Sequence, residues 1–347
     1  CFTLLGYGLK EDGYLELCAP AESTITIPSF SMAWIIELAD HLMYSGRIEN
    51  ARAALPKIKK MMDIYIKNIS DDLLVTPIGD RYWHFYEWAQ GLDSSSIFTK
   101  DGGLKNIRFD APLNLFFCLA LDAAANIAKA CNQMELAMSY EMYQSRLKDA
   151  FHSRFWNDKK GLYETYYGDG CDEHYAQLTQ ALALCAKACP DDLAPKLREK
   201  LVYDRRLVQT TLSHSIYKYE ALMGEPEKYA SIVFNSIAKD WGYMLFNGAT
   251  SFWETINGAD DFDNAGSLCH GWSAIPIYFY YAYILGIKPV EPGFKKFTVK
   301  PVRGIVNKAS GKIPTPYGII DISLEETGTG LKFDIKNPEG TEYITGI

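Results

Sequence analysis

Residues 241–272 read WGYMLFNGATSFWETINGADDFDNAGSLCHGW, with polar, aromatic and glycine residues at a density that neither a packed core nor a linker requires. Glu254 follows Trp253, and His270 lies further along the same stretch. Aromatic faces cover the apolar C–H side of a sugar ring, and a carboxylate in a partly dry pocket can serve as a general acid or base. The stretch therefore favours a sugar site, although a Glu in such a context is more often a solvated residue at the end of a helix or strand.

The residues from 248 onward match the motifs of a known protein family in order. From residue 248 to residue 301 the chain resembles the C-terminal part of the six-hairpin domain of the α-L-rhamnosidases, glycoside hydrolase family 78. The matching residues are, in order, Gly248-Ala249-Thr250, Trp253-Glu254, Ser267-Leu268, His270, Gly286-Ile287, and the run that begins Pro292-Gly293-Phe294-Lys295 and ends at Pro301. The relatives in this family are mostly bacterial and fungal, and the resemblance implies a glycosidase.

Composition places the chain among ordinary soluble globular proteins, with 347 residues of which 48% are hydrophobic and 22% charged. This length allows one large domain, or a large and a small one. The 14% aromatic content, with 23 Tyr and 7 Trp, is high. Sugar-binding clefts are a common reason for such an excess, and large helical cores are another. The formal charge of −8 argues against nucleic acid or an anionic membrane as partner.

We expect no membrane span, no zinc site, no disulfide scaffold and no cofactor. The best apolar candidate for a span is residues 275–287, which is shorter than the roughly 18–20 residues required. The eight cysteines form no Cys-x-x-Cys pair; they are Cys1, Cys18, Cys118, Cys131, Cys171, Cys185, Cys189 and Cys269. The chain starts at Cys1 without a signal-peptide pattern, and its compartment stays open, although unpaired cysteines mildly favour a reducing one.

Helical periodicity dominates the chain up to residue 285. Apolar positions recur at helical spacing in residues 29–44 and again in residues 48–69, which predicts an antiparallel helical hairpin. The pattern repeats at about 111–131 with 134–153, 173–188 with 191–202, and 210–223 with 226–239, followed by a final helix at about 266–285. No βαβ alternation is present. We therefore predict a mainly α fold, an (α/α)6 six-hairpin toroid.

The predicted toroid is incomplete at its N-terminus. A full six-hairpin barrel needs twelve helices, and the chain predicts nine or ten, with residues 1–10 as the end of an earlier helix. Residues 154–168 predict a small aromatic β-hairpin with its turn at Asp158-Lys159-Lys160-Gly161. After Gly286 the pattern changes to alternation, which predicts a small antiparallel β module. We thus assign 1–287 to the glycosidase domain and 288–347 to a β-sandwich-like module, which we expect to be cut short.

A second candidate cluster lies in residues 79–93, GDRYWHFYEWAQGLD. It holds Asp80, Trp83, Glu87, Trp88 and Asp93 between two helical hairpins, where the mouth of a toroid would place them. Trp83 and Trp88 could equally be core residues, with the carboxylates on a solvated rim. In the rhamnosidases a loop at this position carries an Asp-Trp or similar pair that contacts the sugar, so the resemblance implies that Glu87 and Trp88 bind substrate.

A third candidate stretch is DEHYAQLTQALAL, residues 172–184. Gln177 lies at the start of a predicted inner helix and suits a sugar hydroxyl, because a buried amide needs partners at both of its ends. His174 fits a capping or surface position better.

The resemblance also implies a mechanism. The family is inverting, and its general base falls on Glu254, which would take a proton from the water that attacks the anomeric carbon. His270 would lie close to the base and hydrogen-bond the substrate. The family's general acid is a Glu within an Asp-Cys-Pro-x-Arg motif, and no such run occurs in these 347 residues. We therefore expect the acid upstream of this chain; a substitute role for Glu87 or Asp80 is the less favoured interpretation.

Two other functions stay open. One is a carbohydrate-binding pseudoenzyme, or an inactive fragment, that keeps the aromatic walls and lacks the acid. The other is a polysaccharide lyase on the same toroid, which would need a Tyr or His base and an Asn, Arg or metal to neutralise a uronate. Phosphate loops and Gly-x-Ser-x-Gly elbows are absent from the sequence. The expected partner is a rhamnosylated glycan or glycoside, with linkage, aglycone and oligomeric state undetermined.

Overall fold

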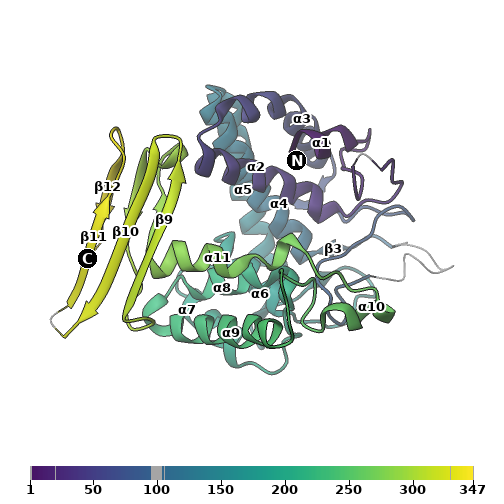
Figure 1. Ribbon diagram of the computed structural model, residues 1–347. Coiled ribbons are helices and arrows are strands. Elements are labelled where there is room, and N and C mark those ends of the chain that lie inside the picture. The colour runs from purple at the N-terminus through teal and green to yellow at the C-terminus, as the bar shows by residue number, and fades with distance from the viewer. Residues whose placement is uncertain (1, 20, 95–103, 105, 329, 347) are drawn as a thin grey trace. The chain divides into compact units, whose positions relative to one another are not determined.

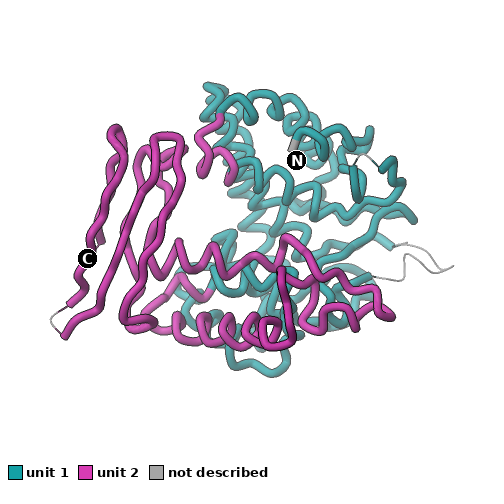
Figure 2. The backbone as a smooth tube through the Cα atoms, in the orientation of Figure 1, with its two compact units in different colours: residues 1–39, 48–221 teal, residues 40–47, 222–347 magenta. Residues whose placement is uncertain are grey.

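The computed structural model describes residues 2–19, 21–94, 104, 106–328 and 330–346. The chain divides into two compact units, shown in teal and magenta in Figure 2. The first unit comprises residues 1–39 and 48–221, and the second comprises residues 40–47 and 222–347. Each unit has its own core and is described by itself.

Helices build almost all of the first unit (Figure 1). In chain order they are α1 (Phe2–Leu5), η1 (Gly6–Gly8), α2 (Pro28–Ser45), α3 (Ile48–Lys67), α4 (Ala111–Ala130), α5 (Met134–Phe155), α6 (Gln177–Cys185), α7 (Ala194–Tyr203), η3 (Leu212–His214) and α8 (Ser215–Leu222). The α4 helix packs against α3, α5 and α6. The predicted serial hairpins are confirmed, and with them the mainly α fold class.

The α4 helix is the core helix of the first unit. Its 20 residues have a mean hydropathy of 1.5 in the most apolar window, so the prediction that no apolar stretch approaches the length of a membrane span is wrong here. However, 83% of that window is buried inside the protein. Leu113, Leu115, Phe116 and Phe117 are at most 1% exposed, and these positions point to different sides of the helix. Such all-round burial explains the hydropathy, because a helix surrounded by neighbours needs no polar face.

The α5 helix, by contrast, has one buried stripe. Its buried residues are Ala137, Tyr140, Leu147, Phe151 and Phe155, which recur at helical spacing. The other faces carry charged residues and partly exposed methionines. An apolar stripe of this kind covers a core helix from outside, and it is the pattern that periodicity predicts best.

Short strands connect the helices of the first unit. The predicted aromatic β-hairpin is confirmed: β4 (Trp156–Asn157) pairs antiparallel with β5 (Leu162–Tyr163). The next segment, β6 (Tyr166–Tyr167), pairs with β3 (Phe109–Asp110). A third pair joins β1 (Ile69–Ser70) to β2 (Leu73–Leu74).

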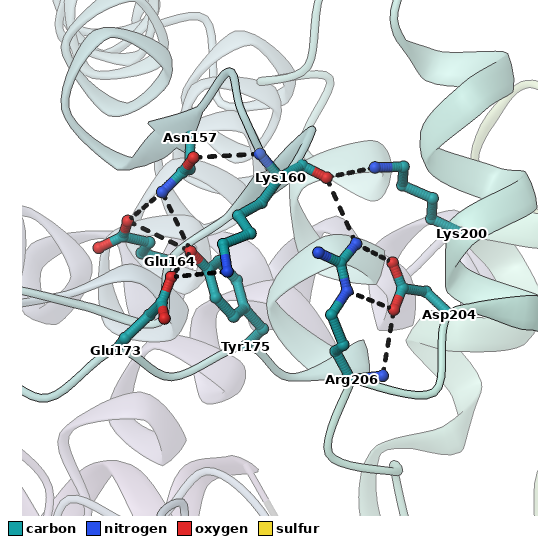
Figure 3. A network of polar contacts seen from close by, with 8 residues as sticks. All are labelled: Asn157, Lys160, Glu164, Glu173, Tyr175, Lys200, Asp204 and Arg206. Carbon is teal, nitrogen blue, oxygen red and sulfur yellow. Dashed lines mark hydrogen bonds and ion pairs between the residues drawn. The ribbon is translucent and has the colours of Figure 1, made fainter.

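A polar network ties the turn of this hairpin to the loop after α7 (Figure 3). The carbonyl oxygen of Lys160 accepts hydrogen bonds from the Lys200 ammonium and from the Arg206 guanidinium. Arg206 also donates to Asp204 over 2.8 Å, and these bonds lower the pKa of Asp204 to about 2. The acidic and basic side chains of the network neutralise one another. We interpret it as a structural network that fixes the hairpin turn to the loop after α7.

The second unit begins with the long helix α9 (Pro226–Phe246) and continues through short helical turns. These are η4 (Gly258–Asp260), α10 (Asp261–Asn264), η5 (Gly271–Ser273), α11 (Ile275–Phe279) and the π-helical segment η6 (Tyr280–Ile284). The prediction of one helix over 266–285 is wrong in its first part. Residues 267–270 pair instead with residues 252–254 through backbone hydrogen bonds between distant parts of the chain, which a helix does not make.

The described residues after 286 form small sheets. Strands β7 (Ile287–Pro289), β8 (Lys296–Val299) and β12 (Glu342–Thr345) form one sheet in the order β12-β8-β7, and the 3₁₀ turn η7 (Pro292–Phe294) joins β7 to β8. Strands β9 (Lys308–Thr315), β10 (Gly318–Thr327) and β11 (Gly330–Lys336) form the other in the order β11-β10-β9. The predicted β module is confirmed, but it is not wholly antiparallel, because β12 runs parallel to β8.

The core of this module comes from alternating residues, as the sequence pattern predicts. The fully buried residues are Phe297 and Val299 on β8 and Ile320 and Ile322 on β10. The register places Ile322 opposite Ile335 on β11, so the inner faces of neighbouring strands meet. The remaining buried core residues come from the end of the helical region, from β7, from the turn before β8, from β9 and from β10; they are Leu285, Ile287, Phe294, Ile313 and Leu324.

Candidate active site

The stretch after α9 folds back on itself and brings Glu254 close to His270. The amide of His270 donates to the carbonyl oxygen of Phe252 over 2.7 Å, and the amide of Glu254 donates to the carbonyl oxygen of Ser267 over 2.9 Å. The Ser251 hydroxyl donates to the carbonyl oxygen of Leu268. Residues 251–254 and 267–270 therefore run side by side within the second unit.

Glu254 is half-buried and its position is fixed from several sides. The amide of Ser267 donates to its Oε2 over 3.2 Å. Its backbone carbonyl accepts a hydrogen bond from the indole Nε1 of Trp272 over 2.8 Å. A carboxylate that is oriented by a backbone amide and still reaches solvent can accept a proton from water.

His270 stacks on the indole ring of Trp272, with ring centroids 3.7 Å apart and ring planes at 27°. Its Nδ1 accepts a hydrogen bond from the Trp272 amide over 3.4 Å. Burial lowers the pKa of His270, and the charge of Glu254 opposes part of that shift. The ring is therefore neutral near pH 7, with Nδ1 as acceptor and Nε2–H as donor.

The loop between the two paired segments supports Trp253. Gly258 has a φ of +59°, and a Cβ at this position would lie 2.7 Å from Trp253 Cε3. Phe262, Asp263 and Asn264 also have positive φ values, of 55°, 56° and 66°. Such backbone conformations cost energy in residues other than glycine, and they concentrate at functional sites. The loop thus holds the half-buried indole of Trp253 beside Glu254.

Glu87, from the second candidate cluster, is 0% exposed. Its carboxylate accepts hydrogen bonds from the amides of Trp88 and Thr211, over 2.9 and 3.1 Å, and from the hydroxyls of Thr211 and Ser213. These four donors use the acceptor positions of the carboxylate. Glu87 therefore fixes the backbone at Trp88 and Thr211 through buried hydrogen bonds, and its charge is not exposed at the surface.

Trp83 and Trp88 are half-buried members of an aromatic cluster in the first unit. Their ring centroids lie 5.9 Å apart, and Phe85 packs 4.6 Å from Trp88 and 5.4 Å from Trp83. The Trp83 indole donates to the carbonyl oxygen of Asp93 over 2.6 Å. Partly exposed indole rings held in fixed orientation suit a sugar face.

No motif in the sequence identified the residues that hold Glu87. Thr211, Ser213 and His214 come from a segment without a recognised motif, and His214 packs among Phe30, Phe85 and Phe116. Burial lowers the pKa of His214, opposed by the charge of Glu87. Their only signal is the polar run Thr-Leu-Ser-His-Ser at a helix start, which by itself indicates capping.

Gln177 is 2% exposed and bonded at both ends. Its Nε2 donates to the carbonyl oxygen of Leu201 over 2.9 Å, and its Oε1 accepts from the Thr210 amide and from Lys218 Nζ. His174 contacts the carbonyl oxygen of Gln90 over 3.0 Å. Both ends of the Gln177 amide therefore bond to other parts of the protein, and the amide is not exposed for a sugar hydroxyl.

Among the described residues, no group of three or more His, Cys, Asp or Glu side chains is arranged to hold a metal ion. The cysteines within the described ranges carry free thiols, and Cys1 lies outside those ranges.

Helical hairpins, a half-buried Glu between aromatic rings and a following β module together define the class, a six-hairpin glycosidase domain. Residues 4–284 match the family model described as the bacterial alpha-L-rhamnosidase 6 hairpin glycosidase domain, and residues 286–344 match the bacterial alpha-L-rhamnosidase C-terminal domain. The chain belongs to the bacterial α-L-rhamnosidase family.

Named relatives agree with this assignment. An alpha-L-rhamnosidase of Alteromonas sp. (strain LOR) is 28% identical over 94% of this chain and 35% of its own length. The crystal structure of the GH78 family rhamnosidase of Bacillus sp. GL1 has a TM-score of 0.86 at 24% identity, over 99% of this chain and 36% of that one. The Streptomyces avermitilis α-L-rhamnosidase complexed with L-rhamnose has a TM-score of 0.75 at 16% identity, over 99% and 32%. The chain therefore spans about a third of the length of these relatives.

Proposed function

We propose that this chain is the part of an inverting glycoside hydrolase that carries the general base, Glu254, for hydrolysis of terminal α-L-rhamnosides or related deoxy-sugar glycosides. The observation that carries the proposal is the placement of Glu254, half-buried beside Trp253 and near His270, with Oε2 held by the Ser267 amide over 3.2 Å. Family membership and the rhamnosidase names of the relatives support the substrate class.

In this mechanism Glu254 accepts a proton from a water molecule. The oxygen of that water forms a bond to the anomeric carbon while the bond from that carbon to the leaving oxygen breaks, and a general acid protonates the leaving oxygen. Inverting enzymes separate their two carboxyl groups by roughly 6.5–9.5 Å to admit the water. The product therefore has the opposite anomeric configuration to the substrate.

The general acid is proposed to lie outside these 347 residues, since the Asp-Cys-Pro-x-Arg motif is missing from the sequence. Glu87 is a poor substitute because it is 0% exposed and its carboxylate accepts four hydrogen bonds. Asp80 is exposed to solvent, whereas a general acid is best served by a partly dry pocket. The roles of acid and base would thus come from different parts of a longer protein.

The other candidate residues fall into two groups. His270, through Nε2–H, is proposed to donate to a sugar hydroxyl, and Trp253, Trp83 and Trp88 to cover apolar sugar faces. Glu87 is proposed to support Trp88, whose amide donates to its carboxylate, and Gln177 to hold the segment at Thr210, both within the first unit. A carbohydrate-binding pseudoenzyme remains the second candidate, since the sequence carries the aromatic walls without the acid motif.

Release of nitrophenol from an aryl α-L-rhamnoside tests the proposal. The 347-residue chain and a version extended upstream would be assayed together, each with L-rhamnose binding measured by calorimetry. Cleavage by the longer protein alone supports the division of acid and base. Rhamnose binding without cleavage by either protein would favour the pseudoenzyme, and neither binding nor cleavage would reject both functions.

A further inference from the structure

Trp272 contacts both the proposed base Glu254 and the proposed sugar-binding residue His270. Its indole Nε1–H donates to the carbonyl oxygen of Glu254 over 2.8 Å. Its ring centroid lies 3.7 Å from that of His270, and its amide donates to His270 Nδ1 over 3.4 Å. The functional residues are thus connected through a third side chain that carries no ionisable group.

The indole hydrogen bond from Trp272 holds the backbone carbonyl of Glu254. Its amide already donates to Ser267, and with the indole bond both backbone polar groups of Glu254 have partners. Residues 254–257 form bends and turns rather than a strand, so no sheet ladder would hold the carbonyl otherwise. Fixed backbone matters because a misplacement of about 1 Å can cost roughly 100-fold in rate.

The other contacts fix the ring of His270. A Nδ1 that accepts an N–H bond must be unprotonated, so the neutral ring carries its proton on Nε2. Stacking on the indole determines the plane in which that Nε2–H points. Both requirements for donation to a hydroxyl, the tautomer and the direction, thus come from residue 272.

We propose that Trp272 is a positioning residue that holds the general base Glu254 and the donor His270 in one arrangement and selects the Nε2–H tautomer of His270. The inference rests on the proposed function for its catalytic consequence. Its structural content, the tautomer and the orientation of His270, does not depend on turnover.

Two substitutions separate the contacts. Trp272→Phe keeps a ring that can stack on His270 and removes the indole hydrogen bond to Glu254. Trp272→Leu removes both. Trp156→Phe is the matched control, because Trp156 also donates an indole hydrogen bond, over 2.7 Å to Asp158, and both of these residues belong to the first unit.

Turnover by the upstream-extended protein gives the first readout. We expect kcat to fall about tenfold in Trp272→Phe, with KM within about twofold, and about 100-fold in Trp272→Leu, with a raised KM because the sugar-binding ring of His270 is no longer held. Azide should restore part of the lost rate, since it forms the bond to the anomeric carbon without deprotonation and the leaving oxygen takes its proton as before. Trp156→Phe should keep wild-type kcat and show no azide effect.

The second readout is ¹⁵N NMR of the His270 ring in the 347-residue chain, where no activity is needed. The wild type should show an unprotonated Nδ1 near pH 7. Trp272→Leu keeps the backbone amide of residue 272 but lacks the indole ring that stacks on His270. Its His270 ring can therefore turn away from that amide and should show a mixture of tautomers. An unchanged tautomer together with kcat within about twofold overturns the inference. If the wild-type protein does not cleave the substrate, the proposed function fails, and the NMR result still decides whether Trp272 fixes His270.

Discussion

The amide of Ser267 donates to the carboxylate of Glu254 over 3.2 Å, while the amide of Glu254 donates to the carbonyl oxygen of Ser267 over 2.9 Å. This reciprocal pair joins the two ends of a loop at the residue proposed as general base. The amide of Ser267 holds the side chain of Glu254, and the carbonyl oxygen of Ser267 holds its backbone amide. The carboxylate and the peptide of Glu254 are therefore oriented together. Changes at Glu254 should consequently affect chemistry without unfolding the protein.

Glu254→Gln should lower kcat of the upstream-extended protein by about 10²–10⁴-fold, because an amide cannot accept the proton of the attacking water. Circular dichroism and the melting temperature should stay at wild-type values. Glu227→Gln, on the exposed side of α9, is the control and should keep full activity. Activity of Glu254→Gln within about tenfold of wild type would place the base elsewhere.

Glu87→Gln should destabilise the protein by about 1–3 kcal/mol, since an amide nitrogen would face the donors of Thr211, Ser213 and Trp88. Urea unfolding measures the change, with Glu227→Gln again as the exposed control. An unchanged free energy of unfolding, combined with weaker rhamnose binding, would instead support direct contact between Glu87 and substrate.

Stability should fall as the pH drops below about 6.5. Burial lowers the pKa of His84, His214 and His270 from the ordinary value of 6.5. The unfolded chain therefore binds more protons than the folded one once the pH falls through 6.5, and the loss continues until the lower folded-state pKa values are passed. Urea unfolding at about pH 7.5 and pH 5.5 measures it. The difference should shrink in His214→Gln, and a difference of the same size in that variant would show that His214 does not contribute.

Gly258→Ala should weaken rhamnose binding, because the added Cβ would lie 2.7 Å from the Trp253 ring and displace it. Gly304→Ala is the matched control: Gly304 also has a positive φ, of +77°, but nothing lies within 4 Å of the added Cβ. Both substitutions should cost stability by about 1 kcal/mol through backbone strain. Calorimetry should show reduced rhamnose affinity in Gly258→Ala alone, and equal affinity in the two variants would remove Trp253 from the site.

His270→Ala should weaken rhamnose affinity more than it lowers stability, because the ring is half-buried and its Nε2–H is proposed to bond the sugar. Calorimetric titration with L-rhamnose and thermal unfolding would be compared on the same sample. Wild-type affinity in this variant would return His270 to a structural role beside Trp272.

The sequence predicted what depends on local pattern. Helical spacing located α5, whose buried residues from Ala137 to Phe155 follow one stripe. Turn chemistry located the hairpin of β4 and β5. The prediction of one helix over 266–285 was wrong because tertiary hydrogen bonds to Phe252 and Glu254 draw residues 267–270 into an extended path, and no propensity encodes those partners.

Among the candidate residues, too, local sequence patterns were predicted and contacts between distant residues were not. Glu254 and His270 were predicted together through a family resemblance, and the structure brings them close. The burial of Glu87 could not be foreseen, because its donors Thr211 and Ser213 are more than a hundred positions away in the chain. Trp272 was part of the quoted stretch, but its contact with the Glu254 carbonyl depends on the turn between them.

The anomeric configuration of the first product tests the central claim most directly. ¹H NMR would follow the cleavage of an aryl α-L-rhamnoside by the upstream-extended protein, beside its Glu254→Gln variant, before the released sugar mutarotates. The account predicts that β-L-rhamnose appears first and that the variant releases none. Release of α-L-rhamnose first, or β-L-rhamnose formed by the variant at the wild-type rate, would contradict the assignment of Glu254 as the base of an inverting enzyme.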